Sequence, residues 1–341
     1  MRGRVCSAAL ALALGVSLTG CAPQETVSQV FAMDTLMTLK IYGDGDTVSA
    51  EEALKRLEER IYTIESELSV TREDSFIHKI NTNCGRTVAV SDDVTKLLTR
   101  TLEICEQTDG ALDITAYSAV KAWGFTTGEN RVPNQNELDE LVKRIDYTQM
   151  QVMENGVVLS DGMQIDLGAV AKGYTGDVLA LGLREMGIES ACLSLGGNVH
   201  TVGTKPDGTY WRVGIEDPET GGALAVVEVS DEAVVTSGNY QRYFEQDGEA
   251  YWHIIDPDTA APARSGLSSV TIIGSEGLYC DALSTALFVM GLDEATDFWR
   301  AYRDFEAIFV EDDGDVFLTS GLKERFSLSE ENKNREVTVL E

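Results

Sequence analysis

Residues 280–291 read CDALSTALFVMG, an apolar run that opens with one carboxylate and one hydroxyl, Asp281 and Thr285. A separation of four residues places both side chains on one face of a helix, with Cβ atoms about 5–6 Å apart. Two hard oxygen ligands at this spacing suit a small cation such as Mg²⁺. The alternative is structural: Asp281 caps the helix, and the Thr285 hydroxyl bonds to the preceding turn. The stretch predicts a helix and leaves the role of its polar pair open.

A loop of small residues precedes another expected helix, at residues 166–173 (DLGAVAKG). It leaves a strand and enters a helix predicted over residues 174–186, so its backbone could approach phosphate oxygens, with Lys172 adding a positive charge. It matches neither the Walker pattern nor the dinucleotide fingerprint. The alternative is a tight turn that leaves Lys172 in solvent.

Three other runs have a similar character. Residues 195–198 (LGGN) end a strand, where paired glycines allow a bulge or a close approach by a ligand. Residues 236–240 (TSGNY) are expected to join two strands. Residues 253–257 (HIIDP) end the next strand, and alternation places His253 and Ile255 on one face.

The remaining pattern mixes helices and strands throughout. A strand is predicted over residues 31–42, and helices are predicted after caps at Ser49, Ser91 and Asn134. Turn signals precede a β-rich second half, in which helices are expected over residues 281–290 and 293–303 and a hairpin at Asp313-Gly314. The pattern predicts an α+β fold, with mixed or antiparallel sheets flanked by helices in two closely packed lobes.

The first residues have the features of a targeting segment. Arg2 and Arg4 precede an apolar run at residues 8–18, which is too short to span a bilayer, and LTGC follows at residues 18–21. This end resembles the lipobox of bacterial lipoproteins. It implies cleavage before Cys21, lipid attachment to that cysteine and anchoring at the extracytoplasmic side of a bacterial cell membrane. The alternative is an ordinary signal peptide with an incidental cysteine.

These signals divide the 341 residues into a signal peptide (1–20), a tether from Cys21 (21–30), one folded domain (31–326) and a polar C-terminal tail (327–341). The chain carries 27 basic and 57 acidic residues, a net charge of −30. That balance argues against nucleic acid as a partner, because phosphate backbones require Lys and Arg. It does not exclude a phosphorylated ligand, since a bound metal ion can supply the positive charge. The scattered cysteines have no spacing typical of a zinc site.

Taken together, the ordered motifs resemble one family, the FAD:protein FMN transferases, also called ApbE flavin transferases. The resemblance covers about residues 31–320 and rests on these segments: 33–35 (MDT), 68–81, 110–115 (GALDIT), 123–125 (WGF), 166–173, 195–198, 211–218, 236–238 (TSG), 253–257 and 281–285. It implies an ApbE-like fold and transfer of the FMN half of FAD to a threonine or serine hydroxyl of an acceptor protein, with release of AMP. Such chemistry needs charge neutralisation, an in-line nucleophile and a proton acceptor.

The resemblance also implies roles for individual residues. The Mg²⁺ ligands would be the Asp281 carboxylate, the Thr285 hydroxyl and the Ala169 carbonyl, with Ser284 as a further candidate. His253 is the candidate base, because imidazole titrates near neutral pH; the alternative is a structural histidine at a strand end. The flavin and its phosphates would be contacted by Met33, Ala111, Leu112, Asp113, Asp166, Lys172 and Ile255.

Two departures from the family pattern affect the expected site. Val70-Thr71 stands where an aromatic residue commonly follows Leu-Ser, so the expected stacking on the flavin ring lacks its usual residue there. Ala260-Ala261 replaces a glycine. The expected acceptors are flavin-bearing subunits of membrane redox complexes or extracellular reductases. Two other functions remain open from the sequence: Mg²⁺-dependent hydrolysis of FAD to FMN and AMP, and flavin or solute binding by a surface lipoprotein without catalysis.

Overall fold

A computed structural model describes residues 24–341 of the protein. The predicted cleavage site and Cys21 lie outside the described residues. The strands of the two larger sheets are β1 (Glu25–Ala32), β2 (Thr35–Tyr42), β5 (Ala191–Leu195), β6 (Asn198–Val202), β7 (Trp211–Glu216), β8 (Ala223–Val229), β9 (Ala233–Gly238), β14 (Leu267–Gly274), β15 (Glu306–Glu311), β16 (Val316–Thr319), β17 (Phe326–Leu328) and β18 (Val337–Leu340).

These strands form a nine-stranded sheet in the order β1-β2-β5-β6-β9-β14-β15-β16-β18 and a three-stranded sheet in the order β17-β8-β7. Neighbouring strands are antiparallel except for the parallel pair β16 and β18. The remaining strands form two-stranded ladders: β3 (Met150–Met153) with β4 (Gly156–Leu159), β10 (Tyr243–Gln246) with β11 (Glu249–Trp252), and β12 (Ile255–Asp256) with β13 (Ala261–Pro262).

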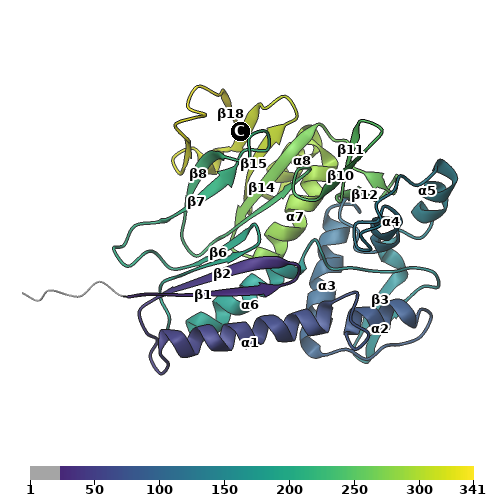
Figure 1. The fold of residues 1–341 in the computed structure, drawn as a ribbon, viewed down its shortest axis with the longest axis horizontal. Helices are drawn as coiled ribbons and strands as arrows, with labels where there is room; N and C mark the ends of the chain where they lie inside the picture. Colours follow the sequence, from purple (N-terminus) through teal and green to yellow (C-terminus); the bar gives the residue numbers. More distant parts are fainter. Residues whose placement is uncertain (1–23) are drawn as a thin grey trace, which may run out of the picture.

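The helices gather on one side of the large sheet. They are α1 (Ala50–Leu68), α2 (Phe76–Thr82), α3 (Asp92–Gln107), α4 (Tyr117–Ala122), α5 (Gln135–Val142), α6 (Ala171–Glu185), α7 (Gly277–Met290) and α8 (Leu292–Tyr302). Figure 1 shows the layers from left to right: the sheet with β7 and β8, the large sheet, the layer of α7, and the group of α3, α4 and α5. The predicted α+β fold is therefore confirmed.

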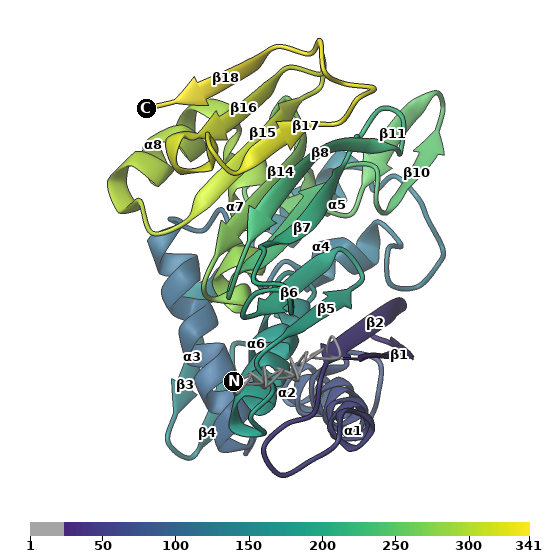
Figure 2. The ribbon, with the colours of Figure 1, turned by 90° about the vertical axis from the view of Figure 1, so that its left-hand side faces the viewer.

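Three of the four buried clusters within residues 24–341 pack the large sheet against its neighbours. Side chains of α1 and α6 pack under β1, β2 and β5 in one lobe, and side chains of α2, α3 and α7 pack with β9 and β14 in the other. The third cluster fills the space between the two sheets. Figure 2 shows β1 and β2 at one end of the large sheet and β18 at the other. Within residues 24–341, the helices are all too short or too polar to cross a bilayer.

The helix starts expected from capping residues are confirmed. Ser49, Ser91 and Asn134 each precede a helix, and each side chain accepts a hydrogen bond from the backbone amide three residues later. Helices α2 and α4 were not predicted, because they are too short to show a clear apolar period.

The single strand predicted over residues 31–42 is wrong. Strands β1 and β2 form a hairpin whose two-residue turn is Met33-Asp34, with φ angles of 50° and 59°. Turns of this kind usually contain glycine, so the sequence carried no turn signal. The Glu65 carboxylate holds the turn by accepting a hydrogen bond from the Met33 amide at 2.6 Å. The connection expected at residues 236–240 also needs correction, because residues 236–238 lie inside β9.

Both predicted ends of the folded domain need correction. Residues 25–30, assigned to the tether, pair with β2 as part of β1. Residues 327–341, assigned to a polar tail, contribute to β17 and form all of β18, whose Val337 and Val339 pack against the cluster between the sheets. The connection between these strands is rich in charged residues, so the two short apolar segments on either side of it were not predicted as strands. The described fold therefore extends from residue 25 to residue 340.

Candidate active site

Helices α6 and α7 meet at their first turns. Asp281 lies in the second turn of α7 and is only 4% exposed. Its Oδ2 accepts a hydrogen bond from the backbone amide of Gly173, in the first turn of α6, at 2.8 Å. A Cβ atom at Gly173 would lie 2.2 Å from the carbonyl oxygen of Gly277, so only glycine permits this approach. Asp281 therefore does not cap its own helix, as the structural alternative required, but binds the start of the neighbouring one.

A second carboxylate makes the reciprocal contact. Asp177 of α6 accepts hydrogen bonds from the amides of Gly277 and Leu278 at 2.7 and 2.8 Å, and so caps α7. Burial raises the pKa of Asp177 to about 6, although these two amides oppose the shift. The two helices thus fix each other's first turns. No sequence pattern pointed to Asp177, which lies inside a helix away from any cap motif.

The carbonyl group of Ala169 lies just before α6, whose N-cap residue is Val170. The first amides of a helix have no acceptor within the helix, and the Gly173 amide donates instead to Asp281. The Asp281 carboxylate is therefore held at the start of α6, next to the loop that contains Ala169, as expected if both groups bind one cation.

The expected hydroxyl ligands lie beside Asp281. The Ser284 hydroxyl donates to the Asp281 carbonyl at 2.8 Å and lies 2.8 Å from the Ser237 hydroxyl of β9. Since Ser284 is fully buried and bonded on both sides, it is the less suitable ligand. Thr285 is half-buried, and its hydroxyl lies 3.4 Å from Ser237. Ser237 belongs to the TSG motif at residues 236–238, which predicts no role for this side chain.

One buried amide near Asp281 remains unsatisfied. Asn198 of β6 is 1% exposed, and its Nδ2 atom has no hydrogen-bond partner among residues 24–341. Burial raises the pKa of Asp281, whereas Lys172, the Gly173 amide and the Asn198 side chain favour the charged form. A buried carboxylate with Lys172 beside it, and a buried amide nearby that lacks a regular hydrogen bond, fit a hydrated cation that carries an anionic ligand.

Lys172 connects this helix crossing with Asp166. The Asp166 carboxylate accepts the Gly168 amide at 2.9 Å, which shapes the loop before α6. Burial raises the pKa of Asp166, and the Gly168 amide, Arg242 and Lys172 oppose that shift. The positive charge of Lys172 also favours the ionised form of Asp281. The loop at residues 166–173 therefore places one lysine near two buried carboxylates.

His253 follows β11 and faces the same two cations. Its Nδ1 lies 3.3 Å from the Arg242 carbonyl oxygen, which can only accept, so Nδ1 carries the proton and Nε2 keeps its lone pair. Burial, together with the charges of Arg242 and Lys172, lowers the pKa of His253 to about 4. The ring is therefore neutral at pH 7 and able to accept a proton.

The residues expected to contact flavin come from four separate segments. The sulfur of Met33 lies 3.8 Å from the Thr175 hydroxyl of α6, which places the β1–β2 turn beside the helix crossing. Ile255 packs with Trp123 at the edge of the other lobe. Leu112 is buried in the core, and Ala111 packs against it from a half-buried position.

Asp113 belongs to the same segment as Ala111 and Leu112, but its side chain is engaged within the protein. Its carboxylate accepts hydrogen bonds from the amide and hydroxyl of Thr115 and from the amide of Tyr147. Burial raises the pKa of Asp113 despite these bonds. Thr71, at the position of the missing aromatic residue, is exposed and bonded to Ser69. The structure thus supports Asp113 as an organiser of its loop.

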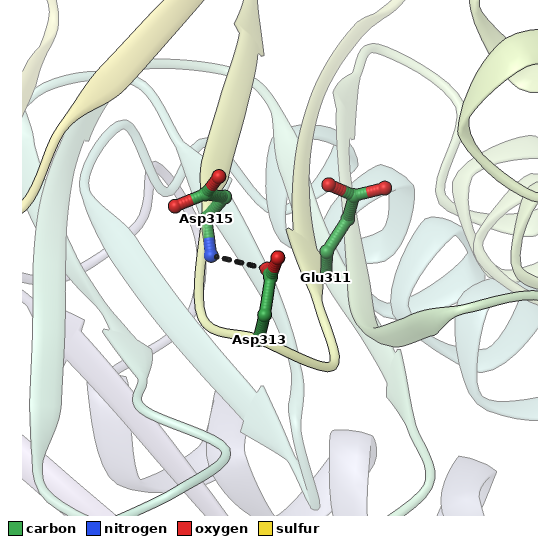
Figure 3. Close-up of side chains that lie close together, drawn as sticks. All are labelled: Glu311, Asp313 and Asp315. Atoms are coloured by element: carbon green, nitrogen blue, oxygen red, sulfur yellow. Dashed lines mark hydrogen bonds between the residues drawn. The ribbon is translucent and has the colours of Figure 1, made fainter.

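A separate acidic cluster lies on the hairpin between β15 and β16. Carboxylate oxygens of Glu311, Asp313 and Asp315 lie within 4.8 Å of one another (Figure 3). The Asp313 carboxylate accepts the Asp315 amide at 3.1 Å and so shapes the turn. Burial and the neighbouring carboxylates raise the pKa of Glu311. These residues belong to a different part of the fold from the α6–α7 crossing.

Comparisons with known proteins agree with this architecture. A model described as the ApbE family matches residues 33–309. The chain is 33% identical to the FAD:protein FMN transferase of Treponema pallidum over 310 residues, which cover 85% of this chain and 86% of that protein. It is 30% identical to the FAD:protein FMN transferase of Escherichia coli K12, with 91% and 92% covered.

Solved structures show the same fold. The ApbE protein of Thermotoga maritima superposes with a TM-score of 0.83 at 31% identity, covering 89% of this chain and 99% of that one. The flavin transferase ApbE of Vibrio cholerae gives a TM-score of 0.81 at 27% identity, with the same coverage. Fold and site together define the class of this protein as an enzyme of the flavin transferase type. The chain belongs to the ApbE family, and the resemblance read from the sequence is confirmed.

Proposed function

We propose that this protein transfers FMN from FAD to a threonine or serine hydroxyl of an acceptor protein, in a Mg²⁺-dependent reaction that releases AMP. The observation that supports the metal site most directly is the Asp281–Gly173 hydrogen bond, which holds a buried carboxylate at the start of α6, next to the loop that contains Ala169. Asp281, Ala169 and Thr285 would hold the cation. When bound, it would neutralise charge on the pyrophosphate of FAD.

Side chains of the protein would bind the phosphates and accept the proton of the acceptor hydroxyl. Lys172 and Arg242 provide positive charge on the side of His253, where the phosphates of FAD would lie. Nε2 of His253 would take the proton of the acceptor hydroxyl as its oxygen bonds to the phosphorus of the FMN half. The bond from that phosphorus to the oxygen of AMP breaks, and AMP leaves with the bridging oxygen. Asp166 and Met33 would help to place the flavin nucleotide.

We also propose that Cys21 is lipid-modified and holds the enzyme at the extracytoplasmic face of a bacterial cell membrane. The basic start, the short apolar run and LTGC at residues 18–21 support this location. Acceptors would then be flavin-bearing subunits of membrane redox complexes or extracellular reductases. Metabolic labelling with a palmitate analogue should mark the wild-type chain and not Cys21→Ser; equal labelling of both would reject the anchor.

A direct assay tests the transfer. The protein is mixed with FAD, Mg²⁺ and an acceptor domain, and the products are separated on a denaturing gel while AMP is measured. We expect a fluorescent acceptor band that is lost with a chelator or when the target threonine is replaced. AMP with free FMN and no labelled band would identify hydrolysis instead. If neither AMP nor a labelled band formed, the result would indicate a flavin-binding protein without catalysis.

A further inference from the structure

The outer edge of the large sheet carries an unusual concentration of exposed apolar side chains. Strand β1 is the last strand at its end of the sheet, and within residues 24–341 it pairs only with β2. Phe31 and Leu36 lie directly opposite each other in the hairpin and are 68% and 56% exposed. Val27, on the same face of β1, is also exposed. Exposed apolar edge strands are usually covered by a partner or protected, because their unpaired backbone groups attract other strands.

Helix α1 adds an aromatic side chain on the other side of this edge. The Glu58 carboxylate bonds to the Ser28 hydroxyl, and the Glu65 carboxylate bonds to the Met33 amide, so this face of α1 looks toward β1. Tyr62 lies between the two glutamates on the same helical face and is half exposed. An added strand would therefore have Phe31 on one side and Tyr62 on the other.

The charges around the edge are mostly negative. Glu25 lies at its start, Asp34 in the turn at its end, and Glu58 and Glu65 along α1. Lys40, opposite Val27, is paired with Glu25 at 3.4 Å. A second copy of this chain, with a net charge of −30, would bring like charges together across such an edge. A segment that carries positive charge beside apolar residues would complement it.

The edge also leads to the site. Strand β1 leads into the turn at Met33, whose sulfur lies beside the Thr175 hydroxyl in the second turn of α6, and the first turn of that helix contains the amide bound by Asp281. A partner laid along β1 would thus end beside the helix crossing. We propose that the edge of β1, with Phe31, Leu36 and Tyr62, is the docking surface for the acceptor protein. The acceptor would add an extended segment with basic and apolar residues to the sheet.

This inference rests on the proposed transfer reaction, and its test separates the two. The full-length variant Phe31→Ser/Leu36→Ser is compared with wild type on an acceptor domain that the wild-type protein labels, and on a short synthetic peptide that contains only the target threonine and its neighbours. We expect KM for the acceptor domain to rise by about ten-fold or more, with kcat within about two-fold of wild type. Transfer to the peptide and FAD affinity should not change.

The control is Leu181→Ser on α6, because Leu181 is exposed to 57%, almost the same fraction as Leu36. It should leave KM for the acceptor domain unchanged. For the wild type, the KM for the acceptor domain should rise with salt, since the rim is charged.

An unchanged KM in the double variant would overturn the docking proposal while leaving transfer intact. Loss of FAD affinity in the double variant would also overturn the docking proposal, because it would assign the patch to the flavin site. Loss of a dimer on gel filtration would overturn it as well, because it would assign the patch to contact with a second copy. If the wild-type protein labelled no acceptor domain at all, that result would instead reject the transfer reaction.

Discussion

Asp281 combines a structural contact with a charge that the fold does not need. Its neighbours Lys172, Gly173 and Asn198 favour the ionised form, yet burial raises its pKa. A carboxylate whose pKa is raised on folding lowers the free energy of unfolding at neutral pH, because its charge is costlier in the folded state. The charge is therefore best explained by a ligand that the site binds.

The substitution Asp281→Asn separates these contributions. Asparagine can still accept the Gly173 amide but cannot supply charge to a cation. We expect AMP release to fall by several orders of magnitude, while the Tm measured without metal stays equal or rises. Ser284→Ala serves as the comparison and should lose much less activity, because its hydroxyl is engaged within the protein. Full activity in Asp281→Asn would contradict the site.

His253 makes a distinct prediction for the pH dependence. Its pKa of about 4 in the free protein means that the basic form dominates above that pH and is lost below it. We expect kcat/KM to be flat from about pH 5 to neutrality, with an acid limb near pH 4 that disappears in His253→Ala.

The pH dependence of kcat should differ from that of kcat/KM. Bound FAD places negative phosphates near Lys172 and Arg242, and so weakens the repulsion that lowers the pKa of His253. The acid limb of kcat should therefore lie at a higher pH than that of kcat/KM. Coincident limbs, or limbs that survive in His253→Ala, would assign the base to another group.

Sequence motifs named most of these candidate residues but not the contacts that they make. Asp281, Thr285 and His253 could be named from motifs, and Ala169 only through the family resemblance. The contacts of Asp177 and Asp281 depend on how two helices distant in sequence meet, which local patterns do not encode. The motif residues Asn198 and Ser237 were visible, but their roles followed only from their positions beside Asp281.

At the level of elements, the α6–α7 crossing depends on glycine at residue 173. A Cβ there would lie 2.2 Å from the Gly277 carbonyl oxygen and 2.7 Å from the Asp281 Cβ. We expect Gly173→Ala to separate the helices, lower the free energy of unfolding by about 1–3 kcal/mol and reduce transfer sharply. Chemical denaturation and the AMP assay would measure both effects.

The same helix offers a matched control. A Cβ at Gly182 would have no neighbouring atom within 4 Å, so Gly182→Ala should raise the free energy of unfolding by about 0.5–1 kcal/mol and leave transfer unchanged. If both glycine variants behaved alike, the close crossing would not be what sets the site.

Elements with strong local signals were predicted well. Helices that begin at capping residues were placed correctly, because the cap and the apolar period agree. The Met33-Asp34 turn was missed, because its positive φ angles are held by contacts from α1 and not by glycine. Such a turn is specified by tertiary structure.

At the level of the whole molecule, strand β18 closes one end of the large sheet. Removing residues 329–341 would expose the edge of β16 and part of the cluster between the sheets. We expect a clear fall in Tm and a tendency to aggregate, measured by thermal scans and light scattering. An unchanged Tm would restore the earlier interpretation of this segment as a polar tail.

The most direct test of the account compares AMP released with FMN bound covalently to an acceptor, measured in one reaction by chromatography and intact-protein mass. We predict one AMP for each FMN attached in the wild type, and neither product above background in Asp281→Asn. AMP accompanied only by free FMN, or equal products from both proteins, would contradict transfer at this site.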